Sequence, residues 1–140
     1  MERQELRDTI ARALTGAAEA CPVLSNFVCQ AADRFRTGEI REGNELLALI
    51  LGDLSVLAGL LSDVRHWSEG GGPGQALPTE SLEEESRQML ERLRMLQEAQ
   101  ERDDWILLAD ILEYELSEKV TDWSGLFRDL STPLLSAQAG

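Results

Sequence analysis

Apolar residues recur every three or four positions along most of the chain, which is the spacing of one face of an α-helix. No stretch alternates apolar and polar residues for long enough to indicate a sheet. Heptad spacing is typical of a long helix that packs against other helices, so the chain is predicted to be all-α. The most regular heptad seam consists of Leu47, Ile50, Leu54, Leu57, Leu61 and Val64.

The same spacing, together with the helix-breaking residues, predicts about five helices. A first amphipathic helix that starts near Leu6 is expected to end before Pro22, because proline lacks the N–H that an interior helix position donates. A second helix, whose inward face includes Phe27 and Phe35, is expected to stop at Gly38. The helix that carries the heptad seam follows as the third.

The second half begins after a loop rich in glycine and proline at residues 68–80. Ser81 and Glu84 have the spacing of a capping box, which predicts the start of a fourth helix. A break near Asp103 leads into a fifth helix, and residues 131–140 are expected to form a frayed tail. The whole chain is therefore expected to form one domain, an up-and-down helical bundle.

The two halves align when residue n is compared with residue n + 65. Gly38 then corresponds to Asp103, and Leu51 corresponds to Leu116. Each half reads as a helix, a short turn and a longer helix. We therefore expect the bundle to consist of two pseudo-repeated helical hairpins.

The run "DDWILLADILEYEL" (residues 103–116) places acidic residues among apolar ones. Asp110 is two residues from both Leu108 and Leu112, about 200° around a helix from each, so it is expected to point away from the inward stripe. Glu113 and Glu115 are expected to flank that stripe or to face solvent. These acids are interpreted mostly as the hydrated side of an amphipathic helix.

Charge and hydropathy exclude several classes of partner. The 26 acidic and 13 basic residues give a net charge of −13, which argues against binding to nucleic acid or to an anionic membrane surface. The longest apolar stretch, residues 46–61, contains Asp53 and is shorter than the roughly 20 residues of a membrane span. A cytoplasmic protein with no membrane segment is expected.

Cys21 and Cys29 would lie about 12 Å apart on one helix, so two free thiols are expected.

Carboxylates spaced by three residues offer an alternative function. All-α nucleotide pyrophosphohydrolases hold Mg²⁺ with such pairs, because this spacing puts both groups on one helix face. The pairs Glu98–Glu101 and Asp110–Glu113 have this spacing, and with 26 acids such pairs also arise by chance. The favoured interpretation includes neither a metal nor a cofactor.

A stripe of small residues runs beside the heptad seam and includes Gly52, Ser55 and Gly59. Small side chains let another helix approach closely, either inside the bundle or from a partner. Trp105 and Tyr114 are candidate interface anchors, since such aromatics often dominate binding energy. These five residues are the predicted partner-binding set.

The segment "QAADRFRTGEIREGNELLALILGDLSVLAGLL" (residues 30–61) resembles the central helical hairpin of flagellar export chaperones, with a Gly-acid-Ile turn followed by Asn-x-x-Leu. The resemblance implies a small antiparallel bundle that wraps an amphipathic export substrate. We therefore expect a non-enzymatic, chaperone- or adapter-like module. It would bind an amphipathic helical segment of a protein partner or form a homodimer.

Overall fold

A computed structural model describes residues 2–70 and 79–139, and within these ranges it contains helices and turns but no strand. The all-α prediction is confirmed. Three separate helices are α1 (Glu2–Arg36), α2 (Ile40–Glu69) and α3 (Thr79–Glu101). A fourth runs without interruption through α4 (Trp105–Asp110), the π-helical turn η1 (Ile111–Leu116) and α5 (Ser117–Ala139).

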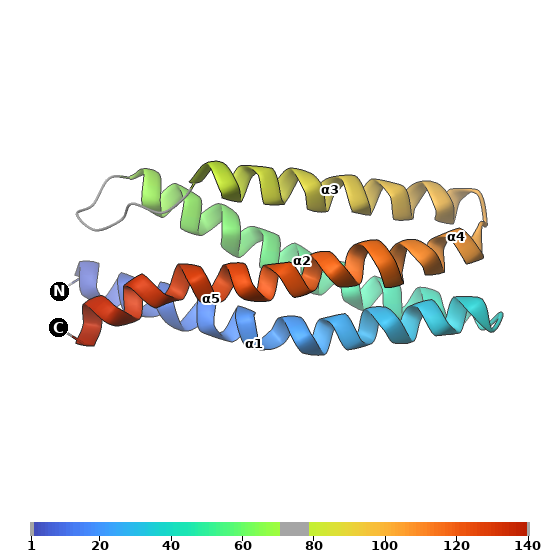
Figure 1. The fold of residues 1–140 in the computed structure, drawn as a ribbon, viewed down its shortest axis with the longest axis horizontal. Helices are drawn as coiled ribbons and strands as arrows, with labels where there is room; N and C mark the ends of the chain where they lie inside the picture. The colour runs from blue at the N-terminus through green and yellow to red at the C-terminus, as the bar shows by residue number, and fades with distance from the viewer. Residues whose placement is uncertain (1, 71–78, 140) are drawn as a thin grey trace.

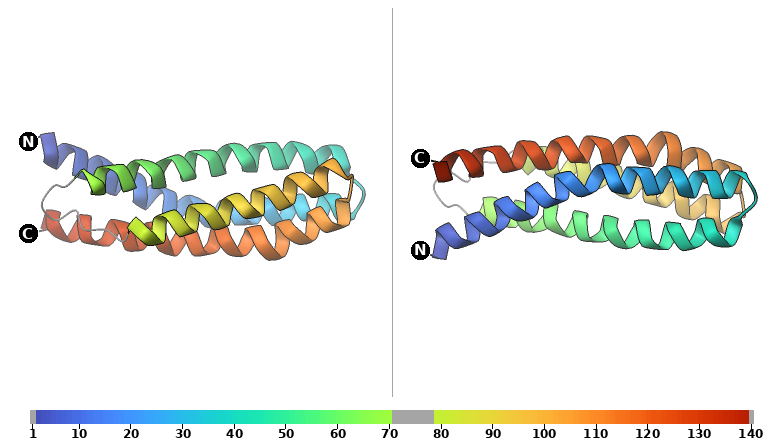
Figure 2. Two further views of the ribbon diagram at one scale, coloured as in Figure 1. Left: turned by 90° about the horizontal axis from the view of Figure 1, so that it is seen from above. Right: turned by 90° about the horizontal axis from the view of Figure 1, so that it is seen from below.

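The four helices lie side by side and alternate in direction (Figure 1). Both ends of the chain lie at one end of the bundle, and the two turns at residues 37–39 and 102–104 lie at the other. Views from above and below show the same elongated arrangement (Figure 2). The bundle is therefore up-and-down in topology.

α1 continues through Pro22, so the predicted break there is wrong and the described residues form four helices rather than five. A proline at position 22 leaves the carbonyl of Ala18 without its usual helical donor. The buried Ser124 hydroxyl, from α5, donates a hydrogen bond of 2.9 Å to this carbonyl. α1 bends in its middle (Figure 2), which is the expected effect of an interior proline.

The turns after α1 and α3 have the same backbone geometry. Gly38 and Asp103 have left-handed backbones, with φ of 82° and 54°. Glu39 N–H donates to Arg34 O at 2.8 Å, and Asp104 N–H donates to the carbonyl of Ala99 at 2.9 Å. These are Schellman turns, which satisfy the last carbonyls of each helix.

Several predicted boundaries differ from the structure. α2 extends to Glu69 and α3 begins at Thr79, so the predicted loop is shorter than 68–80, and its residues 71–78 lie outside the described ranges. Ser81 is already inside α3 and does not cap it. The predicted tail continues α5 to Ala139, and its Leu134 side chain is fully buried.

The core lies along the inner faces of the helices. All six seam residues of α2 are buried, as predicted. The buried face of α1 is rich in alanine, which lets α5 approach closely. Within α5, Trp123 packs edge-on against Phe127, with ring centroids 6.0 Å apart. Cys21 and Cys29 are free, and burial raises the pKa of the Cys21 thiol to about 11.

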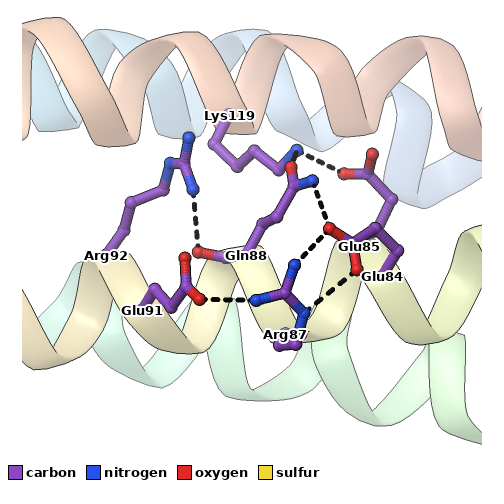
Figure 3. Close-up of polar contacts among 7 residues, drawn as sticks. All are labelled: Glu84, Glu85, Arg87, Gln88, Glu91, Arg92 and Lys119. Carbon is purple, nitrogen blue, oxygen red and sulfur yellow. Dashed lines mark hydrogen bonds and ion pairs between the residues drawn. The ribbon is translucent and has the colours of Figure 1, made fainter.

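Polar side chains fasten α3 to α5 (Figure 3). The buried Lys119 ammonium lies 2.7 Å from a carboxylate oxygen of Glu85 and also donates to the side-chain oxygen of Gln88. Trp123 Nε1 donates to the same Glu85 oxygen at 3.1 Å. Glu85 therefore joins a buried cation and a buried indole to α3.

Candidate functional site

Large apolar side chains are exposed on α1 and α2 where these helices face solvent together. Val23 and Phe27 of α1 are 58% and 41% exposed, and Leu49 and Val56 of α2 are 68% and 72% exposed. Phe27 was expected to point inward, and that prediction is wrong. Exposed apolar clusters on a small protein mark binding surfaces more often than scattered single residues do.

Two open depressions lie between these side chains, and together we call them the α1–α2 groove. The larger has a volume of about 370 Å³ and the smaller about 140 Å³. Phe27 and Asp53 line both, so the two depressions are neighbours. The remaining lining residues are Ala20, Val23, Leu24, Val56 and Leu57 in the larger, and Leu46, Leu49 and Ile50 in the smaller.

The groove has a one-sided charge. Residues 13–32 of α1 and 42–64 of α2 contain five charged side chains and all are acidic: Glu19, Glu42, Glu45, Asp53 and Asp63. Of these five side chains, Glu45 forms an ion pair within the described ranges. Its partner is Arg41, at 3.3 Å. Asp53, which lines both depressions, has no ion-pair partner among the described residues. The groove combines apolar walls with one acidic residue that lines both depressions, and the helix segments that form it carry four further acids and no base.

The predicted small-residue stripe lies on the outer face of α2. Gly52, Ser55 and Gly59 are all exposed, and a Cβ added at either glycine would meet no heavy atom within 4 Å. The interpretation of this stripe as packing inside the bundle is therefore wrong. The three residues do not line the depressions but share the exposed face of α2 with Leu49 and Val56.

The two predicted aromatic anchors lie near the C-terminal end of α1, away from the groove. Trp105 is half-buried and stacks on Phe35 with ring centroids 5.7 Å apart. Tyr114 is 64% exposed, and the guanidinium of Arg36 lies 5.9 Å from its ring centre. A hydrogen bond with the Glu113 carboxylate raises the pKa of Tyr114. The structure therefore does not join these aromatics to the small-residue stripe.

The four carboxylates of the alternative metal site do not form a cluster. Arg36 binds both Asp110 and Glu113, each at 2.9 Å, while Glu98 and Glu101 are exposed on α3. In the part of the chain that the structure describes, no three side chains of His, Cys, Asp or Glu are grouped so that they could hold a metal ion. The geometry therefore gives this site no support.

The lining residues of the groove were missed by the sequence reasoning, although α2 carried a signal. Leu46, Leu49 and Val56 are apolar positions outside the heptad seam, and a helix that is apolar on all sides is unusual at a protein surface. By length and composition α2 is apolar enough to cross a membrane, and 33% of its most apolar 18-residue stretch is buried in the bundle. This excess of apolar surface is the feature that distinguishes α2.

Comparison with known proteins identifies a family. The model of a domain of unknown function (DUF8042) matches residues 12–126, so the chain belongs to this family. No curated protein and no solved structure matches the chain significantly. These comparisons do not support the resemblance of residues 30–61 to flagellar export chaperones. The residues that line the groove all lie within the matched range.

Proposed function

We propose that this DUF8042 domain is a non-enzymatic protein-interaction module that binds an amphipathic helical segment of a partner protein in the α1–α2 groove. The observation that carries the proposal is the set of four exposed apolar side chains around two depressions. Grooves between paired helices are a common receptor for the apolar face of a third helix. Such a partner would cover the surface that the bundle leaves exposed.

The spacing of the exposed residues supports a helical ligand. Leu49 and Val56 are seven residues apart, about 10.5 Å along α2, which equals two turns of a helix that packs alongside. Apolar ligand side chains seven residues apart could therefore enter the two depressions. Gly52 and Gly59 leave the outer face of α2 open, so the ligand backbone can come close.

Replacing Leu49 or Val56 with serine is expected to weaken binding about tenfold for each variant, because each exposed side chain would contribute roughly 1.5 kcal/mol of apolar burial. Stability should change by less than about 0.5 kcal/mol, since both side chains are exposed. The probe is a labelled 15-residue amphipathic peptide with leucines seven residues apart and glutamine on its polar face, and the measurement is fluorescence anisotropy.

Ile106→Ser is the matched control, because Ile106 is 59% exposed and lies on α4 outside the groove. Equal losses for Ile106→Ser and Val56→Ser would contradict the proposal, as would absence of binding at millimolar peptide. Sedimentation of the protein alone gives a second reading. A dimer that Val56→Ser dissociates would assign the surface to self-association instead.

We also infer that the two helical hairpins are related copies. The buried positions of α2 and of the fourth helix correspond with an offset of 65 at Leu112, in the first turn of η1, and of 66 from Leu116 onward, as though the π-helical turn held one additional residue. Leu116 then corresponds to the buried Ile50 and not to Leu51, which is 38% exposed. The corresponding buried pairs are Leu47–Leu112, Ile50–Leu116, Leu54–Val120, Leu57–Trp123, Leu61–Phe127 and Val64–Leu130.

Deletion of Glu115 from η1 is expected to change the free energy of unfolding by less than about 1 kcal/mol. The deletion would convert the π-helical turn into α-helix and restore the spacing of three that separates Leu47 from Ile50. Deleting the exposed Gln97 from α3 is the control, because no π-helical turn there can absorb the change, and it should cost several kcal/mol through misplaced core residues. Equal losses in urea denaturation would contradict the inference.

A further inference from the structure

We infer that the segment bound in the α1–α2 groove is basic, with a lysine or arginine between its two apolar anchors so that the cation lies over Asp53. This inference rests on the proposed function and adds the chemical class of the partner. Three features support it: the charge of the groove, the position of Asp53 relative to the two depressions, and the distribution of basic residues in the chain.

All 13 basic residues of the protein lie outside the two stretches that flank the groove, residues 13–32 and 42–64. Elsewhere arginines neutralise nearby acids. Arg36 binds two carboxylates of the fourth helix, and Arg87 lies between Glu84 and Glu91 on α3 (Figure 3). In the described residues, Asp53 has no basic partner, so the groove is an apolar surface with a negative charge that another molecule would balance.

The position of Asp53 determines where the partner's cation should be. Asp53 lines both depressions, so this residue borders both of the sites that two apolar anchors would fill. On a ligand helix with anchors at i and i + 7, the residue at i + 3 or i + 4 occupies the same face. A lysine or arginine there could reach Asp53 while its aliphatic stem packs against Phe27.

The charge pattern argues against two other occupants. A second copy of the chain would bring its own acidic α1 and α2 segments against these, and like charges in an interface cost free energy. An anionic bilayer would be repelled in the same way, although α2 is apolar enough to attract lipid. A basic amphipathic helix satisfies both the apolar walls and the carboxylate of Asp53.

The test compares three 15-residue peptides that share leucines at i and i + 7 and differ at i + 4, which is lysine, glutamine or glutamate. The lysine peptide is expected to bind about fivefold more tightly than the glutamine peptide at 50 mM salt, and the glutamate peptide more weakly than both. The preference should shrink at 500 mM salt, because ions screen the attraction.

Asp53→Asn is expected to reduce the lysine preference to less than twofold. Asp129→Asn is the matched control, since Asp129 is exposed on α5 and its loss changes the net charge equally. An equal effect of both variants would show long-range attraction only and overturn the inference.

The outcomes separate this inference from the proposed function. Groove binding of the glutamine peptide with no gain from lysine would overturn the basic partner while leaving the interaction module in place. Failure of all three peptides to bind would overturn both. Binding to phosphatidylglycerol vesicles by a protein that binds none of the peptides would identify a lipid surface instead.

Discussion

Replacing Glu85 with leucine is expected to lower the free energy of unfolding by about 2–3 kcal/mol. The change would leave the buried Lys119 ammonium without its carboxylate, and removing one partner of a buried ion pair typically costs about 3–5 kcal/mol. The loss of unfolding free energy in Glu85→Leu should be smaller than this, because the Glu85 side chain is 26% exposed. The loss includes the hydrogen bond from Trp123 Nε1. Urea denaturation measures the difference.

Two further variants test the physical reason. Lys119→Met removes the cation, so it should cost about 1 kcal/mol or less, and the double variant Glu85→Leu with Lys119→Met should recover most of the stability. This pattern would show that the unpaired charge, and not lost packing, causes the defect. Strictly additive losses in the double variant would contradict this explanation.

The sequence was sufficient to predict the all-α class and the seam of α2. Six apolar residues at heptad spacing, with no proline among them, leave one face that can be buried. The inward stripe of the fourth helix was predicted for the same reason, and Leu108, Leu112, Val120 and Trp123 are fully buried. Local periodicity decides such cases because burial of the apolar stripe provides most of the free energy that holds a helix in the bundle.

The rest depends on contacts between residues far apart in the chain. Pro22 removes the helical donor of the Ala18 carbonyl, and the hydroxyl that donates to this carbonyl instead belongs to Ser124, more than one hundred positions away. Phe27 fits the helical period of the α1 core, yet it is 41% exposed because, among the helices of the described ranges, no third helix covers the gap between α1 and α2. The groove could not be located from sequence, since an apolar position becomes a surface only when the placement of all four helices is known.

Replacing Ser124 with alanine is expected to cost about 1–3 kcal/mol, because the Ala18 carbonyl would lose its donor. The cost should lie toward the lower end of this range, since Pro22 and Ser124 line an open depression of about 430 Å³, and water entering it after the substitution would be a replacement donor. Ser131→Ala is the matched control. Ser131 is also buried, but its hydroxyl donates within its own helix to Arg128 O, which also accepts from Thr132.

The role of Ser124 can be isolated with Pro22→Ala, which restores an N–H at position 22. In that background the Ala18 carbonyl has a helical donor. The loss of unfolding free energy caused by Ser124→Ala should therefore be smaller than in the natural sequence by about 0.5–1 kcal/mol. The four free energies of unfolding form a double-mutant cycle. A coupling energy of zero would mean that Ser124 stabilises the bundle by packing alone. A positive coupling would show that a hydroxyl on α5 allows α1 to remain one helix through a proline, which keeps Val23 and Phe27 on the same continuous wall of the groove.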